Sequence, residues 1–328
     1  MKEYKWMHIS SRRPISKSGL IAELDQKKNG IAILSGPSSC GKSMLLYTLR
    51  CATKTPMLIY TCEQIADSIL AVAHAGKLSD GVPVFKNHPL NTIIAIEDVD
   101  YYFSGRQDSR HLVYRNLIHL AESCLIILTG IDLEIKMPDL FDYFPEADFY
   151  CAMNDQTEFW DLYYETGEKI PNRFHVRGKP IPAEEGYYHL VVNVFIRDRQ
   201  HRYLMGQRSA DRKSFPLKWE GCGGSTLMGE SSLDAGIREA HEELGISLDP
   251  KDAILIDKRV RKEIRGERYL DILHTYLFEV DKIVWSPNEA LTKDEVEDSR
   301  LFTLPEIWEL YRAGQLHPDL DYIFDLLT

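Results

Sequence analysis

The fold of the second half of this chain is decided by one stretch, residues 224–246, which reads GSTLMGESSLDAGIREAHEELGI. Within it, residues 232–244 have the apolar periodicity of an amphipathic helix, and Gly245 is placed to cap its C-terminal end. Strand-like runs surround this helix at His189–Ile196, Arg202–Arg208, Ile254–Arg261 and Leu270–Val280. Two more helices are expected near residues 305–313 and 318–327. The second half therefore predicts an α+β domain with a mixed sheet.

The predicted helix carries three glutamates on about one turn. Glu239 and Glu243 are four residues apart and share a face, and Glu242 lies three residues beyond Glu239. Such a cluster is repulsive unless cations neutralise it, and its hard oxygens suit Mg²⁺ or Mn²⁺. We expect Arg238 to pair with a glutamate, with Glu230 as the best-placed partner, and so to hold the preceding loop against the helix.

The same stretch matches a known signature. Its glycines, its arginine and its glutamates stand at the fixed positions of the Nudix consensus GX5EX7REUXEEXGU, so residues 158–310 resemble the Nudix superfamily. The segments that resemble the subgroup of isopentenyl-diphosphate isomerases and their hydrolase-like neighbours are Glu158-Phe-Trp-Asp161, Gly167, Arg177-Gly178, His189-Leu-Val-Val, Gln207-Arg208 and Trp219.

Two residues argue against an isomerase. Cys222 lies one place out of register with the catalytic cysteine of those enzymes, and Ser225 stands where their metal-binding histidine would be. The isomerases also degrade the Arg-Glu and Glu-Glu pairs of the consensus, which are intact here. The resemblance therefore implies a metal-dependent hydrolase of a diphosphate linkage in a nucleotide-type substrate, and isomerisation is the less favoured alternative.

The resemblance also implies a role for each residue. The residues expected to form the metal site are Gly224, Glu230, Glu239, Glu242 and Glu243. The residues expected to act in catalysis are Arg238, Glu242, Glu243 and Glu295. A metal-bound water loses a proton more easily and attacks phosphorus. Glu295 matches a later acidic loop of the family and is the candidate general base, although within the run Asp294–Asp298 a solvated surface residue explains it equally well.

The first half of the chain alternates short apolar runs with amphipathic stretches. The runs expected to be buried strands are Ile31–Ser35, Met57–Tyr60, Thr92–Ile96 and Cys124–Thr129. The stretches expected to be helices are Lys42–Arg50, Glu63–Ala75 and Ser109–Glu122. This alternation predicts an α/β fold with a parallel sheet. Because the pattern changes after Asn154, we expect two domains, 1–155 and 156–328.

A phosphate-binding loop follows the first of these strands. Residues 36–43, Gly-Pro-Ser-Ser-Cys-Gly-Lys-Ser, match GxxxxGK[ST] between a strand and a helix. Glycines let backbone N–H groups close around phosphates, Lys42 reaches the β- and γ-phosphates, and Ser43 ligates magnesium. The residues expected to contact ATP in this P-loop are Gly36, Ser39, Cys40, Gly41, Lys42, Ser43 and Met44.

Two further strand ends are expected to complete the nucleotide site. The run beginning at Thr92 ends in two acids. Of these, Glu97 would hold the hydration shell of magnesium and Asp98 would polarise the attacking water. Thr129 ends another apolar run, where a sensor of the γ-phosphate would lie, although its preference for strands explains it equally well.

Residues 30–150 resemble the ATPase domain of the bacterial replication initiator DnaA and its AAA+ relatives. Besides the P-loop, the matching segments are Met57-Leu-Ile-Tyr-Thr-Cys-Glu63, Gly76-Lys77-Leu78, Ile96-Glu97-Asp98-Val99 and Leu128-Thr129. The resemblance implies ATP binding on a RecA-like sheet. Glu97 replaces the usual aspartate, residues 137–149 contain no arginine or lysine, and neither a helical lid nor a DNA-binding domain follows. We therefore expect ATP binding rather than vigorous hydrolysis, and no origin binding.

Composition narrows the class of partner. The net charge is −11, from 39 basic and 50 acidic residues, so the chain lacks the basic surplus that a phosphate backbone requires and nucleic acid is not expected. It has neither a run of about 18 apolar residues nor a secretory signal, so no membrane partner is expected. The six cysteines form no CxxC pair, which predicts reduced thiols in a cytoplasmic protein.

These observations favour a Nudix hydrolase whose activity or assembly is governed by ATP or ADP at the N-terminal module, with a homo-oligomer as one form of assembly. One alternative is a nucleotide-sensing regulator whose Nudix fold binds a ligand without turnover. Another is a DNA-linked AAA+-type ATPase. The intact glutamates of residues 239–243 favour the hydrolase.

Overall fold

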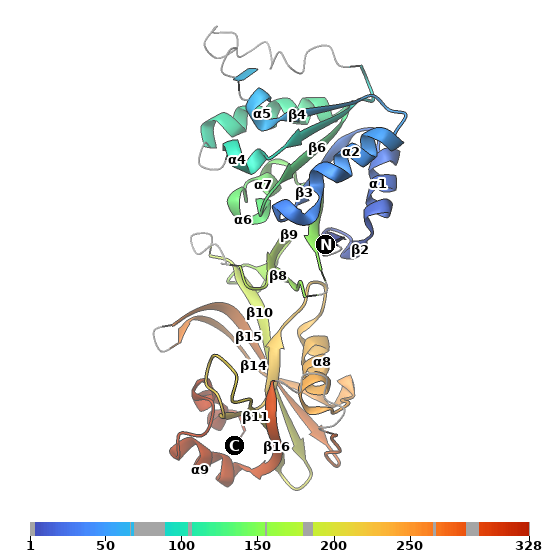
Figure 1. Cartoon of the computed structure of the whole chain (residues 1–328). Coiled ribbons are helices and arrows are strands. Elements are labelled where there is room, and N and C mark those ends of the chain that lie inside the picture. Colours follow the sequence, from blue (N-terminus) through green and yellow to red (C-terminus); the bar gives the residue numbers. More distant parts are fainter. Residues whose placement is uncertain are drawn as a thin grey trace. The chain divides into compact units, whose positions relative to one another are not determined.

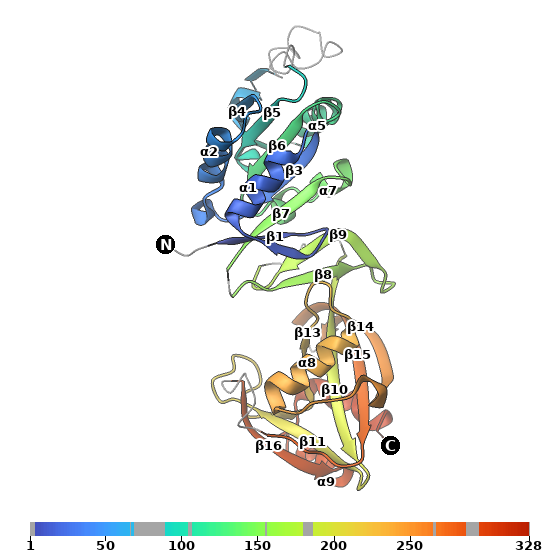
Figure 2. The ribbon, with the colours of Figure 1, turned by 90° about the vertical axis from the view of Figure 1, so that its right-hand side faces the viewer.

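The computed structural model describes residues 4–65, 67–68, 89–103, 107–154, 156–179, 186–264, 267–286 and 295–327. The chain divides into two compact units (Figures 1 and 2). Unit 1 contains Met1–Thr157 and Pro171–Arg173, and unit 2 contains Glu158–Ile170 and Phe174–Thr328. No helix in the described part of the chain is long and apolar enough to cross a membrane.

Unit 1 is built on a sheet of seven strands. They are β1 (Lys5–His8), β2 (Arg13–Ile15), β3 (Gly30–Ser35), β4 (Met57–Thr61), β5 (Ile93–Glu97), β6 (Leu125–Gly130) and β7 (Asp148–Met153). Their order is β2-β1-β7-β3-β6-β5-β4. The five strands from β7 to β4 are parallel, and β1 and β2 extend one edge in antiparallel pairing. The parallel sheet expected from the alternating pattern is confirmed.

Helices cover both faces of this sheet. They are α1 (Lys17–Gln26), α2 (Lys42–Ala52), α4 (Val99–Phe103), α5 (Gln107–Ala121), α6 (Leu133–Lys136) and α7 (Leu140–Tyr143). Leucines of α1 and α2 pack in one core with Ala32 and Leu34 of β3. On the other face, Val113 and Leu117 of α5 line a small apolar space with Leu128 of β6. Because strand side chains alternate between two covered faces, these strands are apolar along their length.

Some elements of unit 1 were not predicted from the sequence, and some predicted segments lie outside the described residues. Strands β1, β2 and β7 and helix α1 were not predicted, because β1 and β2 are too short to show a period and β7 mixes aromatic and small residues. The expected helix Glu63–Ala75 lies mostly outside the described residues, and Gly76-Lys77-Leu78 lies wholly outside them.

Unit 2 contains a mixed sheet of nine strands. They are β8 (Phe159–Tyr163), β9 (Lys169–Val176), β10 (Tyr188–Asp198), β11 (Arg202–Arg208), β12 (Trp219–Glu220), β13 (Cys222–Ser225), β14 (Ala253–Ile264), β15 (Glu267–Val280) and β16 (Val296–Thr303). The central strand β10 is parallel to β15 and antiparallel to β8, β11 and β13. The mixed sheet expected from the sequence is confirmed.

Helix α8 (Ser232–Leu244) begins and ends at the predicted residues. The side chain of Ser231 caps its first turn, and Gly245 ends it in the left-handed conformation with φ of 63°. Ala240 and Leu244 pack in a core with Val192 of β10, so the opposite side of the helix is left for its charged residues. The chain closes with α9 (Leu304–Arg312) and a 3₁₀ helix, η6 (Pro318–Asp325), where a second helix was expected.

Candidate active site

Strand β13 lies against the acidic side of α8. A Cβ atom added at Gly224 would clash with the carboxylate of Glu239, so a larger residue at this position would displace that side chain. The neighbouring Gly223 donates its N–H to Oε2 of Glu243 at 3.2 Å. The bare backbone of β13 therefore positions two of the three carboxylates that the sequence analysis selected.

Arg238 ties the loop before α8 to the acidic side of that helix. Its Nε and Nη2 donate to the two carboxylate oxygens of Glu230 at 2.9 and 3.1 Å, so the predicted Arg238–Glu230 pair is confirmed and is bidentate. Its Nη1 donates to Glu239 at 2.8 Å and to Glu242 at 2.9 Å. Nη2 also donates to the carbonyl of Ser225 at 3.2 Å. One guanidinium thus holds three carboxylates and the end of β13.

The carboxylates face one cavity of about 370 Å³. The acids that line it are Glu158, Glu239, Glu242, Glu243 and Glu295. The arginines that line it are Arg177, Arg208, Arg212 and Arg238. Acids suit divalent cations and arginines suit phosphate oxygens, so the two kinds of lining together fit a phosphate ester bound with a cation.

Three arginines of this cavity were not predicted as site residues. Arg212 donates to Oε2 of Glu295 at 2.8 Å and lies 3.8 Å from Oε1 of Glu243, and so it brings Glu295 to the cavity. Arg177 pairs with Glu158 at 2.6 Å, and Arg208 enters from β11. Arg212 lies in a loop without periodicity, so no sequence pattern selected it. Arg177 and Arg208 belong to segments that carried the family resemblance, which was the one available signal.

Burial makes two of the carboxylates weaker acids. Burial raises the pKa of Glu243 well above its ordinary value, and the nearby charge of Glu239 raises it further. Burial also raises the pKa of Glu239, although Arg238 opposes this shift. Without a cation, the folded protein therefore favours a proton on this cluster.

This shift predicts a pH dependence of stability. A folded-state pKa raised above the unfolded value contributes stability that is present at low pH and lost as pH rises through the folded pKa. In EDTA, we therefore expect wild type to lose stability relative to Glu243→Gln as the pH rises above about 5, where an unfolded carboxyl is already charged. Thermal unfolding of both proteins measures the difference, and saturating Mg²⁺ should remove it. A difference that stays constant with pH would contradict a raised pKa at Glu243.

Glu239, Glu242 and Glu243 are residues of a type that binds divalent cations, but their carboxylates do not converge on one point as the ligands of a bound ion do. Within the described ranges, no three acidic, histidine or cysteine side chains converge as a ready cation site. Arg238 accounts for this, because its Nη1 lies between Glu239 and Glu242. The donors are nevertheless hard carboxylate oxygens, and the buried carboxyl of Glu243 gains its charge most easily beside a cation.

The predicted P-loop joins β3 to α2 in unit 1. Gly41 adopts the left-handed conformation with φ of 84°, which favours glycine. Lys42 is buried, and its Nζ donates to the carbonyls of Gly36 at 2.6 Å and of Pro37 at 3.0 Å. The remaining predicted residues are Ser39 and Cys40 in a short 3₁₀ turn, and Ser43 and Met44 in the exposed first turn of α2.

Strand register brings the other predicted nucleotide-binding residues to the same end of the sheet, at the carboxyl ends of its parallel strands. Leu34 of β3 is paired with Thr129 of β6, and Ile96 of β5 is paired with Leu128. Glu97 and Thr129 therefore end neighbouring strands on the side where β3 enters the P-loop. Thr129 is buried, Glu97 is half-buried, and Asp98 is exposed.

The family match lies in the second half of the chain. A family model described as NUDIX domain matches residues 187–327. An uncharacterized Nudix hydrolase of Listeria monocytogenes is 33% identical over 172 residues, which cover 52% of this chain and 95% of the relative. An isopentenyl-diphosphate Delta-isomerase of Cutibacterium acnes is 34% identical over 64 residues, 19% of this chain and 32% of its own length. A crystal structure from Deinococcus radiodurans has a TM-score of 0.40 at 22% identity, over 51% of this chain and 96% of its own.

Proposed function

Because this chain belongs to the Nudix hydrolase family, we propose that it cleaves a diphosphate linkage of a nucleotide-type substrate in the cavity beside α8. The observation that supports this most is the lining of that cavity. Glu239, Glu242 and Glu243 face it together, and arginines form its other walls. Cation ligands and phosphate ligands are thus combined within one space of suitable size.

The residues of the cavity divide the work between them. Mg²⁺ or Mn²⁺, when bound at Glu239, Glu242 and Glu243, supplies positive charge that makes a water easier to deprotonate and stabilises charge on the phosphates. Both carboxylate oxygens of Glu230 accept hydrogen bonds from Arg238, and one of them also accepts the N–H of Leu227. We therefore assign Glu230 a positioning role in place of the metal-ligand role predicted from the sequence. Gly224 provides the space that Glu239 occupies.

The remaining charged residues bind the phosphates and handle the proton. Arg177, Arg208 and Arg212 line the cavity and can donate to phosphate oxygens with the geometry that guanidinium groups favour. Glu295 also lines the cavity and remains the proposed proton acceptor, held in place by Arg212.

The position of Cys222 favours hydrolysis over isomerisation. Its thiol is buried, lies 3.9 Å from the carbonyl oxygen of Val194, and does not line the cavity of the carboxylates. Burial raises the pKa of this thiol well above its ordinary value, and Glu243 and Glu239 raise it further. A cysteine that transfers protons to a substrate would need access to the bound molecule, and Cys222 has none.

The direct test is a substrate screen with purified protein. Dinucleotides, nucleoside-diphosphate sugars, nucleoside triphosphates and prenyl diphosphates would be offered with Mg²⁺ or Mn²⁺, with and without ATP. We expect metal-dependent release of phosphate-containing products from at least one nucleotide, and none in EDTA. Absence of release from every compound would overturn the proposed activity.

We also propose that unit 1 binds ATP and thereby regulates the activity or assembly of the hydrolase. Support comes from the sequence match to a P-loop between β3 and α2, and from the N–H groups in the first turn of α2. Glu97 and Thr129 lie at the carboxyl ends of neighbouring strands of the same sheet. Ligands of such sheets bind beyond the carboxyl ends of the strands, which is where these residues lie.

Replacing Lys42 tests this second proposal. Lys42→Ala should abolish measurable ATP binding, because it removes the cation that would meet the β- and γ-phosphates. Calorimetric titration with ATP and Mg²⁺ measures this, with Lys28→Ala, an exposed lysine of the same unit, as the matched control. If the units are coupled, Lys42→Ala should also change the ATP dependence of substrate cleavage or the oligomeric state. ATP binding of wild-type strength in the variant would contradict the proposed nucleotide site. Unchanged cleavage and an unchanged oligomeric state would contradict the proposed coupling between the units.

A further inference from the structure

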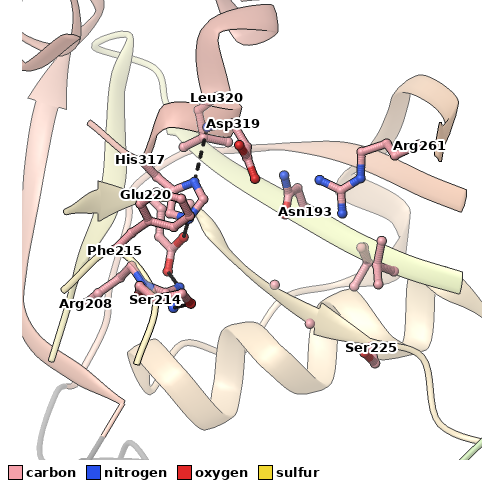
Figure 3. Close-up of a pocket in the computed structure, with 15 residues that line it drawn as sticks. Asn193, Arg208, Ser214, Phe215, Glu220, Ser225, Arg261, His317, Asp319 and Leu320 are labelled. Carbon is pink, nitrogen blue, oxygen red and sulfur yellow. Dashed lines mark hydrogen bonds and ion pairs between the residues drawn. The ribbon is translucent and has the colours of Figure 1, made fainter. Parts of the chain in front are cut away.

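A second cavity, of about 250 Å³, adjoins the carboxylate cavity of unit 2 (Figure 3). The two cavities share the wall residues Arg208, Gly223, Gly224 and Ser225. A substrate whose diphosphate lies beside α8 can therefore extend along β13 into this second space. Its organic part would then meet side chains such as Asn193, Phe215 and His317, to which neither the family consensus nor the proposed mechanism assigns a role.

The walls of the second cavity are mostly polar. Figure 3 shows Asn193, Arg261 and Asp319 on one side. The groups on the other side are Arg208, Ser214, Phe215, Glu220 and His317. These donors and acceptors come from β10, β11, β12, β14, the loop between β11 and β12, and the start of η6.

The charges of this cavity are largely neutralised within the protein. Arg208 donates to Glu220 at 2.6 Å, and Arg261 binds Asp271 through two hydrogen bonds of 2.7 and 2.8 Å. These pairs weaken the attraction of the cavity for another anion. The cavity also contains the amide of Asn193, whose Nδ2 donates to Oη of Tyr322 at 2.9 Å. An amide carries a second N–H and a carbonyl oxygen, and such groups suit a neutral polar ligand.

An aromatic ring forms part of the same wall. Phe215 has φ of 49°, in the left-handed region that a bulky residue enters only at a cost, and strain of this kind is concentrated at functional sites. Its ring meets His317 edge-on, with ring centroids 4.7 Å apart. The loop therefore holds a flat apolar surface beside hydrogen-bonding groups, a combination that binds planar heterocycles.

We propose that this second cavity binds the base of the substrate and selects nucleotides over prenyl diphosphates, an inference that rests on the proposed hydrolase function. A base would stack against Phe215 and hydrogen-bond to groups such as Asn193 and Glu220, in addition to the bonds that these make to Tyr322 and Arg208. A prenyl chain in the same space would desolvate these groups without offering any hydrogen bond in return, which is costly.

Binding of uncleavable analogues tests the inference independently of turnover. The probes are the α,β-methylene analogues of the four common nucleoside diphosphates, the matching analogue of geranyl diphosphate, and methylenediphosphonate as a phosphate-only ligand, all with Mg²⁺. Titrations would be made in the Lys42→Ala background, so that the P-loop of unit 1 does not contribute. We expect at least one nucleotide analogue to bind about tenfold or more tightly than the geranyl analogue.

Variants then locate the difference. Phe215→Ala and Asn193→Leu should each weaken the preferred nucleotide analogue by about tenfold, while methylenediphosphonate binds as before. Gln200→Leu, an exposed polar-to-leucine change in the turn after β10, is the matched control and should change nothing. Phe215 lies in a loop, so its variant keeps the test decisive if Asn193→Leu lowers the melting temperature.

The outcomes separate this inference from the proposed activity. Equal affinity for nucleotide and geranyl analogues would overturn the base-binding cavity, and so would a nucleotide affinity that neither variant changes. Both conclusions hold even if the substrate screen finds metal-dependent cleavage. Nucleotide preference with the expected losses would support the cavity even if that screen finds no cleavage, and the proposed hydrolysis alone would then fail.

Discussion

Replacement of Glu243 by glutamine is expected to lower kcat/KM for the cleaved substrate by more than about a hundredfold at saturating Mg²⁺. Loss of a residue that only supports a metal ligand lowers activity by up to about a hundredfold, and loss of a ligand itself should cost more. Glu243 is buried at the base of the carboxylate cavity, and its Oε2 accepts the N–H of Gly223. Glutamine keeps the size of the side chain and an oxygen for this bond, and it removes only the charge. The loss should therefore appear in catalysis and not in folding.

Steady-state kinetics with Mg²⁺, combined with thermal unfolding, measures this separation. Glu309→Gln on α9 is the matched control, because Glu309 is 71% exposed and its pair with Arg312 contributes little to stability. We expect kinetics of wild-type strength from this control. Activity of Glu243→Gln close to that of wild type would show that the carboxylate cluster does not carry the reaction.

Replacement of Arg238 by methionine should destabilise unit 2 by about 3 kcal/mol and abolish cleavage. Removing one partner of a partly buried network of ion pairs leaves the other charges uncompensated. Three carboxylates depend on this guanidinium, at distances between 2.8 and 3.1 Å. Methionine preserves much of the apolar stem, so the cost arises from the stranded glutamates. The melting temperature should fall by roughly 6 to 12 °C, on the scale typical of units of this size.

Two further variants make this result specific. Arg238→Lys should recover only part of the stability, since an ammonium group cannot bind Glu230 with two parallel hydrogen bonds while also reaching Glu239 and Glu242. Arg312→Met, at an arginine whose side chain is 68% exposed, should leave the melting temperature almost unchanged. If Arg238→Met melts at the temperature of wild type, the network does not hold the loop against α8.

Local signals in the sequence were sufficient for the centre of the site. Helix α8 has the predicted bounds because a capping serine, an amphipathic period and a terminal glycine all lie within one short stretch. The pair between Arg238 and Glu230 was predicted for the same reason, since the spacing of the consensus places them on facing parts of one loop and helix. Information carried within about 20 residues was thus readable without a structure.

The rest of the cavity depends on contacts between distant segments. Arg212 reaches Glu295 across 83 positions of the chain. Glu158 lies just before β8 and Arg177 just after β9, so the antiparallel pairing of these strands brings the two residues together. The cavity that contains Asn193, Phe215 and His317 is assembled from four separate parts of unit 2. No periodicity or motif links such residues, because their proximity is set by strand pairing and not by local spacing.

In unit 1, four of the five parallel strands, β3, β4, β5 and β6, were predictable because each is a continuous apolar run, whereas β7 was not. The strand order was not, since nothing in the sequence indicates that β7 lies beside β3 or that β1 extends the sheet. The register that brings Glu97 and Thr129 to the edge beside the P-loop follows from that order. Whether ATP binds at this edge stays a prediction.

Binding of Mn²⁺ in the absence of nucleotide is the measurement closest to the chemistry proposed for Glu239, Glu242 and Glu243. Electron paramagnetic resonance of the unbound ion would follow a titration of wild type at about pH 8, because ligands bind a metal in their deprotonated form and affinity therefore rises with pH. We predict saturable binding to wild type and its loss in a variant with glutamine at all three positions. Absence of binding to wild type, or equal binding to the triple variant, would contradict a cation-dependent reaction at this cluster.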